Sequence, residues 1–234
     1  MSEIRTAIVL AAGAGSRLRE LEPYKPLCRV GGKPLIDHAI EKLAEAGIER
    51  VIVVTGYGAE IIEAHLESRG WPVEVEVAET LDWRLPNGVS ARAAAPFLKG
   101  EPALMAMCDH IVDPALYERV RLAGAGEGLR LGIDRRLGHP WVDPDDVTCV
   151  RTQGEDIVAI GKGLDPHDAY DTGVFALAPA FFEEIAALEA PSVSEAVLRL
   201  AERGAAKVVD CSDLRWIDVD DKAALAKAER AKWG

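Results

Sequence analysis

A glycine-rich stretch near the amino terminus carries the residues best suited to bind phosphate. Residues 8–18 read IVLAAGAGSRL, and residues 24–27 follow with YKPL. An apolar segment that passes into small and glycine residues predicts a buried strand followed by a loop whose backbone can approach a ligand closely. The exposed N–H groups of such a loop form an anion-binding concavity, to which Arg17 and Lys25 add positive charge. The stretch therefore predicts a site for a phosphorylated ligand.

Two common glycine-rich nucleotide-binding patterns do not fit this stretch. The dinucleotide fingerprint needs glycine at the position of Leu18, and the P-loop needs Gly-Lys followed by Ser or Thr at residues 16–18, which read Ser-Arg-Leu. As spacing alone, a glycine-rich loop after a strand also fits a plain structural turn. The longer pattern of residues is needed to decide between the two interpretations.

The longer pattern resembles a known signature. The string LAAGAGSRL, with KPL and GGKPLIDHAI after it, resembles MobA-like and sugar-phosphate nucleotidyltransferases, which activate phosphorylated sugars and alcohols with a nucleoside triphosphate. The segments CDHIVDPALYERV, IGKGLDPHDAYDTGVFAL and LRWIDVDD are most similar to CTP:inositol-1-phosphate cytidylyltransferases. That resemblance implies that the phosphate of inositol 1-phosphate, or of a similar phospho-alcohol, attacks the α-phosphate of CTP to give a CDP-alcohol and pyrophosphate. It also implies Mg²⁺ as the cofactor and a role in making phospholipid precursors.

The resemblance assigns roles to individual positions. Arg17, Lys25 and Lys162 are implied to be catalytic, and Lys162 is directed at the acceptor's phosphate. Asp109 and Asp218 are implied to be metal ligands. The implied nucleotide-binding residues are Leu10, Ala11, Ala12, Gly13, Gly15, Ser16, Asn87, Gly88 and Ser90. The implied substrate-binding residues are Lys162, Asp171, Asp134 and Tyr170.

Several of these positions also have structural explanations. The pair Asn87-Gly88 is a common turn, and Ser90 is of a residue type that caps helices. Lys162 also fits an exposed lysine of a hairpin. Asp220 is expected to cap the last helix instead of joining the metal site. Two alternatives, a place in the pocket wall or a purely structural role, apply to Asp134, His139, Trp141 and Tyr170.

These residue types suit nucleotidyl transfer without a general base. A phosphomonoester with a second pKa near ~6 is largely dianionic at neutral pH, so it is already a nucleophile. The catalytic task is to bring two anions together and to stabilise charge on the transferring group and on the leaving pyrophosphate. Cationic side chains meet that need together with Mg²⁺, which favours a few carboxylates combined with phosphate oxygens and water.

The elements that must position these residues follow an α/β pattern. Apolar strands alternate with helical repeats over residues 34–46 and 58–69, which predicts a parallel sheet with helices on both faces. Asp109 follows the strand ALMAM, and a carboxylate at the carboxyl end of a central strand lies where open α/β sheets bind ligands.

The rhythm changes at about residue 129, where short strands follow one another without helices between them. This predicts an antiparallel or mixed extension that covers the cleft. The expected fold class is therefore α/β, with a Rossmann-like, mixed and mostly parallel central sheet flanked by helices and a small β lid. The resemblance identifies it as the nucleotide-diphospho-sugar transferase fold. We expect a single nucleotidyltransferase domain over residues 1–234, in which about 129–178 form an acceptor-binding β insertion.

The composition of the chain limits the classes of partner that it can bind. The chain has 49% hydrophobic and 28% charged residues, as ordinary soluble globular proteins do, and a net charge of −12 that argues against a nucleic-acid surface. Its four cysteines have no Cys-x-x-Cys spacing and are expected to be reduced core residues. Neither a signal peptide nor an apolar run approaching the ~20 residues of a membrane span is present, so we expect a cytoplasmic protein with no direct membrane insertion.

The expected partners are a nucleoside triphosphate, with CTP favoured, and a small phosphomonoester. Many of the cytidylyltransferases that the chain resembles are fused to a membrane phosphotransferase. This chain ends at Gly234 without such a segment. A downstream membrane phosphotransferase is therefore expected to be a separate polypeptide.

Other acceptors and one other class of function remain open. A phosphocholine cytidylyltransferase would use aromatic residues such as Trp141 and Tyr170 to cage a quaternary ammonium, and a hexose-1-phosphate nucleotidyltransferase shares the amino-terminal motifs. A molybdopterin nucleotidyltransferase shares the first loop but fits the IGK and DTG segments less well. A catalytically silent regulatory module that binds a nucleotide sugar would tolerate loss of the loop cations or metal carboxylates, and all four positions are filled.

Overall fold

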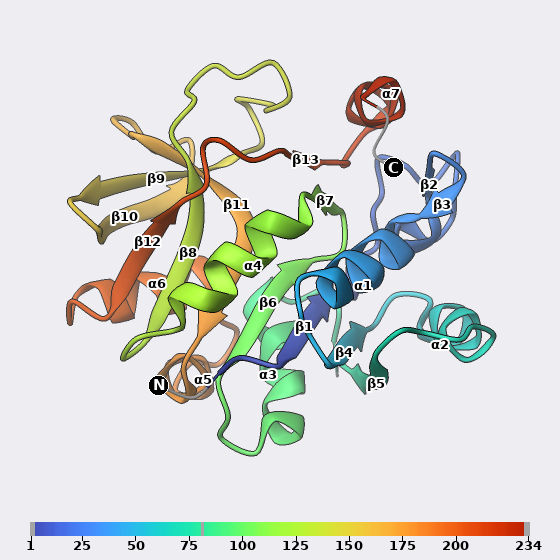
Figure 1. Ribbon diagram of the computed structural model, residues 1–234, viewed down its shortest axis with the longest axis horizontal. Coiled ribbons are helices and arrows are strands. Elements are labelled where there is room, and N and C mark those ends of the chain that lie inside the picture. The colour runs from blue at the N-terminus through green and yellow to red at the C-terminus, as the bar shows by residue number, and fades with distance from the viewer. Residues whose placement is uncertain (1–2, 81, 232–234) are drawn as a thin grey trace.

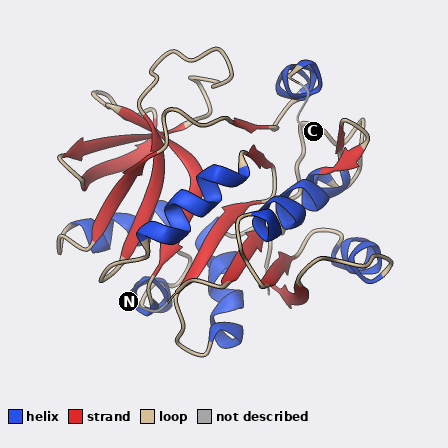
Figure 2. Ribbon diagram, viewed as in Figure 1, coloured by secondary structure: helices blue, strands red, loops and turns tan. Residues whose placement is uncertain are grey.

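The fold is built on a large mixed sheet covered by helices on both faces, with two small two-stranded sheets beside it, as the computed structural model of residues 3–80 and 82–231 shows (Figure 1). Nine strands follow the order β5-β4-β1-β6-β11-β8-β12-β10-β9. Figure 2 shows that the strands fan across the molecule, with helices in front of and behind them. The predicted α/β class is therefore confirmed.

The amino-terminal half of the sheet is parallel, as the β-α repeats predict. Its strands are β1 (Thr6–Leu10), β4 (Arg50–Thr55), β5 (Glu74–Glu79) and β6 (Ala103–Met107). Each pairs in parallel with its neighbours in the order β5-β4-β1-β6. All four carboxyl ends consequently meet at one edge of the sheet, where the glycine-rich loop leaves β1 and Asp109 follows β6.

The remaining strands are mixed in direction. They are β8 (Leu129–Asp134), β9 (Thr148–Gln153), β10 (Asp156–Lys162), β11 (Ala169–Leu177) and β12 (Ala206–Asp210). β11 runs antiparallel to both β6 and β8, and β12 runs parallel to β8. The segment expected to form a β insertion thus places two strands, β8 and β11, inside the main sheet, because both are apolar and buried almost throughout. Its other two strands form a hairpin at the sheet edge.

Side chains of alternate residues enter two separate cores. In β1, Ala7 and Val9 join the core under α1, α2 and α4, whereas Ile8 joins the core under α3, α5 and α6. Strands buried on both faces read as continuous apolar runs, which explains the sequence of β1. The helices are α1 (Leu35–Glu45), α2 (Ala59–Glu67), α3 (Asn87–Leu98), α4 (Pro114–Ala123), α5 (Pro179–Ala186) and α6 (Val193–Ala201).

A third, smaller core supports the elements beside the sheet edge. They are a 3-10 helix (Lys25–Leu27), β2 (Arg29–Val30), β3 (Lys33–Pro34), β7 (His110–Val112), β13 (Trp216–Asp218) and α7 (Lys222–Arg230). Buried residues from the start and the end of the chain, such as Leu18 and Ile217, pack together in this core. β7 pairs antiparallel with β13, which brings Asp218 opposite His110.

Two further expectations concern cysteines and membranes. All four cysteines are buried and unpaired, as expected of core residues. Within the described part of the chain, no helix has the length and apolar character that a membrane span requires.

The hydroxyl of Tyr117 generates a prediction about stability. Tyr117 is fully buried in α4, and its Oη has no hydrogen-bond partner among the described residues. An unsatisfied buried polar group costs roughly 1–3 kcal/mol. We therefore expect Tyr117→Phe to raise the free energy of unfolding by about 1 kcal/mol in a urea titration. A loss of stability of similar size would reveal a partner for this hydroxyl.

Candidate active site

The glycine-rich loop leaves β1 and turns back over Lys25. The N–H of Ala11 donates to the carbonyl oxygen of Val54 at 2.9 Å, which ties the start of the loop to β4. Gly15 has a φ of +56°, and a Cβ atom there would collide with the Cβ of Lys25. Only glycine combines this left-handed backbone with so close an approach. The loop and Lys25 therefore form one packed unit.

Lys25 is a buried cation held by two carboxylates. Its side chain is 8% exposed, and its Nζ donates to Oδ2 of Asp109 at 2.5 Å and also pairs with Oδ1 of Asp220. Burial opposes the charged ammonium, but Asp109 and Asp220 outweigh it and raise the pKa of Lys25 well above its ordinary value. Burial likewise opposes the charge of Asp109, yet Lys25 keeps the pKa of that carboxyl low. Lys25 is therefore a permanent positive charge.

Asp220 belongs to this site, so the expectation that it caps the last helix is wrong. The cap of α7 is Asp221, whose carboxylate accepts the N–H of Ala224 at 2.7 Å. The helix begins one residue later than expected, which leaves Asp220 facing the loop. There it accepts from Lys25 and from Arg17, the latter at 2.6 Å. The sequence held one signal of this second role. Asp220 and Asp221 are adjacent and only one of them can cap the helix, which leaves the other for a different role.

His110 lies between the two aspartates that the sequence singles out. Its Nε2 is 3.6 Å from Oδ2 of Asp218 and 3.9 Å from Oδ1 of Asp109. Its Nδ1 lies 2.8 Å from the carbonyl oxygen of Thr172, which can only accept, so Nδ1 carries a hydrogen. Burial opposes the charged ring, but Asp218 and Asp109 outweigh it and raise the pKa of His110 to about 10. The ring also stacks on Trp216.

Two groups of side chains could each hold a metal ion. The ligand atoms of Asp109, His110 and Asp218 lie within 4.8 Å of one another, and so do those of Asp146, Asp218 and Asp220. Asp218 belongs to both groups, and its Oδ1 is buried with no hydrogen-bond partner among the described residues. Clustered carboxylate oxygens with one left unpartnered fit a divalent cation that prefers oxygen ligands.

Two cavities meet at Asp109 and Asp220, which line both. The loop cavity, about 270 Å³, is lined by Leu10, Ala11, Gly13, Gly15, Ser16, Arg17, Lys25, Pro26, Cys108, Asp109 and Asp220. The tryptophan cavity, about 260 Å³, has among its lining residues Asn87, Met107, Asp109, His110, Trp141, Asp146, Lys162, Asp171, Trp216, Asp218 and Asp220. A ligand in either cavity would therefore contact the same pair of carboxylates.

The structure brings together most of the residues expected to bind nucleotide. Five of the six in the first loop line the loop cavity, whereas Ala12 is buried in the core beneath it. Asn87 lines the tryptophan cavity, and its Oδ1 accepts the N–H of Val193 at 2.9 Å. Gly88 packs against the backbone at residues 191–192, and Ser90 is buried within α3. Gly88 and Ser90 line neither of the two cavities.

The residues expected to bind the acceptor divide into two pairs. Lys162 and Asp171 line the tryptophan cavity, and burial raises the pKa of Asp171 to about 6. Asp134 and Tyr170 line neither of these cavities. Asp134 accepts the indole N–H of Trp216 at 2.9 Å, and the Tyr170 hydroxyl oxygen accepts the N–H of Gly138 at 3.0 Å. Asp134 therefore supports Trp216, which lines the cavity, and Tyr170 is bonded to the loop between β8 and β9.

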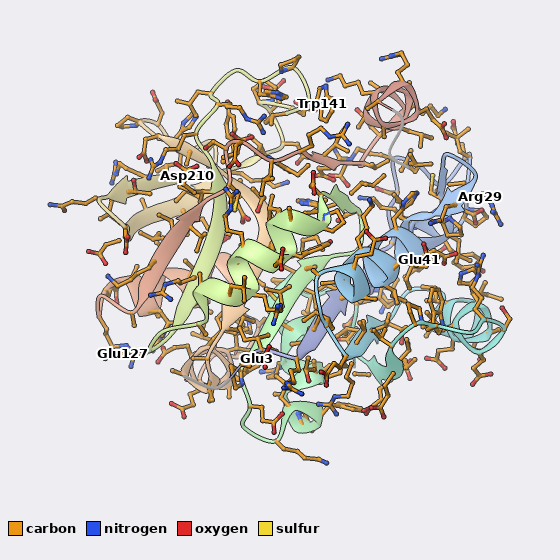
Figure 3. All side chains as sticks on the ribbon, viewed as in Figure 1. Glu3, Arg29, Glu41, Glu127, Trp141 and Asp210 are labelled. Atoms are coloured by element: carbon orange, nitrogen blue, oxygen red, sulfur yellow. The ribbon has the colours of Figure 1, made fainter. Side chains whose placement is uncertain are left out.

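Trp141 and Asp146 come from the loop between β8 and β9. Figure 3 shows Trp141 on the side of this loop that faces α7, and both residues line the tryptophan cavity. An Oδ2 of Asp146 accepts from Arg17 at 2.5 Å, and its other oxygen pairs with Lys162. The sequence did not predict Asp146, because nothing in its local pattern distinguishes it from the neighbouring aspartates.

Comparison with known proteins gives consistent matches. Residues 7–210 match the family described as MobA-like NTP transferase domain. The chain is 36% identical over 233 residues to a Rubrobacter xylanophilus protein named bifunctional IPC transferase and DIPP synthase, with 97% of this chain and 52% of the relative covered. The chain spans about half the length of the curated relatives it matches most strongly.

Solved structures show the same fold. The inositol-1-phosphate CTP transferase from T. maritima has a TM-score of 0.86 and 26% identity, covering 100% of this chain and 98% of that chain. A UDP-glucose pyrophosphorylase complexed with UDP-glucose has a TM-score of 0.82 at 16% identity, covering 98% of both chains. These likenesses confirm the nucleotide-diphospho-sugar transferase fold.

The contact between Gly15 and Lys25 generates a prediction about activity. Gly15→Ala should shift Lys25, and because small displacements of charged groups are costly, we expect nucleotide turnover to fall by roughly 10- to 100-fold. Gly154→Ala is the matched control, since Gly154 has a φ of +65° but open space around it. Gly154→Ala should lose only the stability that the left-handed backbone costs, whereas Gly15→Ala should lose more because of the collision with Lys25, and only Gly15→Ala should lose turnover. Equal turnover in the two variants would contradict this role of the contact.

Proposed function

This chain belongs to the family of MobA-like NTP transferase domains, and from that premise we propose that it transfers the cytidylyl group of CTP to inositol 1-phosphate. The observation that carries the proposal is the pair of cavities that share Asp109 and Asp220 beside the buried ammonium of Lys25. The reaction joins two anions, so each of them needs its own binding site. The two sites must adjoin at a fixed positive charge, where the reacting atoms meet. The name of the solved T. maritima structure supports the choice of CTP and inositol 1-phosphate.

The loop cavity suits the triphosphate. Its wall is made of the glycine-rich backbone, whose N–H groups can donate to phosphate oxygens, and Arg17 adds a bidentate donor at its rim. Lys25 lies where the loop cavity meets the tryptophan cavity, which suits the α-phosphate. Because Lys25 is already desolvated and held in place, it would stabilise developing charge without reorganisation.

The tryptophan cavity suits a phosphorylated polyol. Lys162 offers a cation for the acceptor's phosphate, and the half-buried indole of Trp141 and the buried indole of Trp216 line the cavity and offer apolar surface to the ring. Asp171 lines the same cavity and can accept hydrogen bonds from ring hydroxyls. Tyr170, one of the two aromatic residues expected to cage a phosphocholine, lies outside the cavity, so a cage there would have to use Trp216 beside Trp141.

In the proposed reaction, an oxygen of the acceptor's phosphate attacks the α-phosphorus of CTP. The bond between that phosphorus and the bridging α–β oxygen breaks, and pyrophosphate leaves with the electron pair. No protein base is needed, since the attacking phosphomonoester is largely dianionic at neutral pH. Arg17, Lys25 and Lys162 would orient the two anions and offset their mutual repulsion.

We propose Mg²⁺ as the metal, held by Asp109 and Asp218. When bound, it would neutralise charge on the phosphate oxygens. His110 would keep Asp218 oriented, because the ring lies 3.6 Å from that carboxylate and is itself held by the Thr172 carbonyl. The unpartnered Oδ1 of Asp218 supports this assignment.

A pyrophosphate-release assay tests the proposal. CTP, GTP, UTP and dTTP are each combined with inositol 1-phosphate, phosphocholine and several hexose 1-phosphates in the presence of Mg²⁺. We expect turnover with CTP and inositol 1-phosphate. Turnover with another pair only would contradict the substrate assignment, and binding of nucleotides without release from any pair would indicate a regulatory module.

The buried ammonium generates a prediction about rate. We expect Lys25→Ala to lower kcat by about 10²–10³, the usual effect of removing a preorganised group that stabilises charge in the transition state. Lys222→Ala is the control. It also removes a lysine from an ion pair, but the pair that Lys222 forms with Glu20 is exposed. A kcat for Lys25→Ala close to that of the control would remove Lys25 from the mechanism.

A further inference from the structure

Asp146 connects two cations that belong to different cavities. Its Oδ2 accepts from Arg17, which lines the loop cavity, at 2.5 Å. Its Oδ1 pairs with Lys162, which lines the tryptophan cavity. The Asp146 side chain is only 20% exposed, whereas those of Arg17 and Lys162 are 49% and 61% exposed. One carboxylate on a loop is thus shared between the triphosphate side and the acceptor side of the site.

Asp146 stays in this position because of those two cations. The carboxylate oxygens of Asp218 and Asp220 lie within 4.8 Å of its own, so like charges surround it. Its backbone N–H donates only within the loop, to the carbonyl oxygen of Asp143. If Arg17 and Lys162 both turned to phosphates, Asp146 would face two carboxylates and the new anions without a cation of its own, because Lys25 and His110 pair with the other two aspartates.

We propose, on the basis of the proposed function, that Asp146 is a positioning residue that holds Arg17 and Lys162 in the substrate-free protein and gives up each of them to a substrate phosphate. The triphosphate takes Arg17, and the acceptor's phosphate takes Lys162. Each exchange removes one of the two ion pairs by which Asp146 ties its part of the loop to the site, while Trp141, Val142 and Val147 keep their packing against the cores. The part of the loop around Asp146 is therefore loosened in two steps that follow the two binding events.

This arrangement couples the two substrates. The first phosphate to bind breaks one ion pair of Asp146, and the other pair still holds the carboxylate in place. The second phosphate breaks the last pair, so Asp146 can move away from Asp218 and Asp220, and the relief of that repulsion lets the second phosphate bind more tightly than it would alone. Such coupling is reciprocal by thermodynamic linkage. Exposed ion pairs contribute little individually, so we expect each exchange to change affinity by about two- to fivefold.

Hydrogen exchange of the backbone amides at residues 141–147 tests the proposal in the full chain, with inorganic tripolyphosphate as the probe. Tripolyphosphate presents the charge of a triphosphate without a base, so the result does not depend on which nucleotide the protein uses. We expect the probe to speed exchange of this loop in the wild type by about two- to fivefold. Without the probe, the loop amides of Asp146→Asn should exchange faster than those of the wild type, and adding the probe should not change their rate. In a separate binding measurement, Asp146→Asn should bind tripolyphosphate about two- to fivefold more tightly than the wild type does.

Asp145→Asn is the matched control, because it removes the same charge from an exposed side chain next to Asp146. It should behave as the wild type in both measurements. Equal exchange in the two variants, or weaker binding of tripolyphosphate by Asp146→Asn, would overturn the proposal. A higher Mg²⁺ requirement of Asp146→Asn with an unchanged loop would also overturn it and identify Asp146 as a metal ligand.

The two proposals fail separately. A loop that responds to tripolyphosphate in a protein without turnover of CTP and inositol 1-phosphate would retain the role of Asp146 and reject the proposed function. Normal turnover without a loop response would retain the proposed function and reject the role of Asp146.

Discussion

The buried ion pairs of Lys25 are the interaction on which the site depends. A lysine that is 8% exposed must be paired, and its two carboxylates come from distant parts of the chain, at Asp109 and Asp220. Removing Lys25 would leave both carboxylates without their shared cation, which is far more costly than losing a surface pair. The two carboxylates line both cavities, and Lys25 lines the loop cavity beside them. The pairing thus holds the carboxyl-terminal segment on the site while it keeps a fixed positive charge between the two cavities.

The other elements of the fold bring these charged groups together where the two cavities meet. The parallel strands β1 and β6 bring the glycine-rich loop and Asp109 to the same edge of the sheet. The short pair β7 and β13 then carries Asp218 back to that edge, and the small core that contains Leu18 and Ile217 fixes both segments. Gly15 completes the arrangement, since any side chain there would occupy the space of Lys25. Ion pairing, packing and the left-handed backbone of Gly15 all hold Lys25 in the same position.

Much of this could be predicted from the sequence, and the exceptions have physical causes. The α/β class, the phosphate-binding loop and the strand-end Asp109 follow from local patterns. The position of β8 and β11 in the sheet does not, because an apolar run marks a strand but not its neighbours. Asp220 was misassigned by one residue at a helix start, where aspartate suits a cap and an ion pair equally. Asp146 escaped prediction because its role depends on Arg17, a residue far away in sequence.

The central claim is that nucleotide and acceptor occupy separate cavities whose shared wall is Asp109 and Asp220 beside Lys25. A crystal structure with an α,β-methylene analogue of CTP and with inositol 1-phosphate tests it most directly. The account predicts the triphosphate in the loop cavity, the acceptor's phosphate beside Lys162, and the α-phosphorus next to Lys25. Both ligands in one cavity, or an α-phosphorus remote from Lys25, would contradict it.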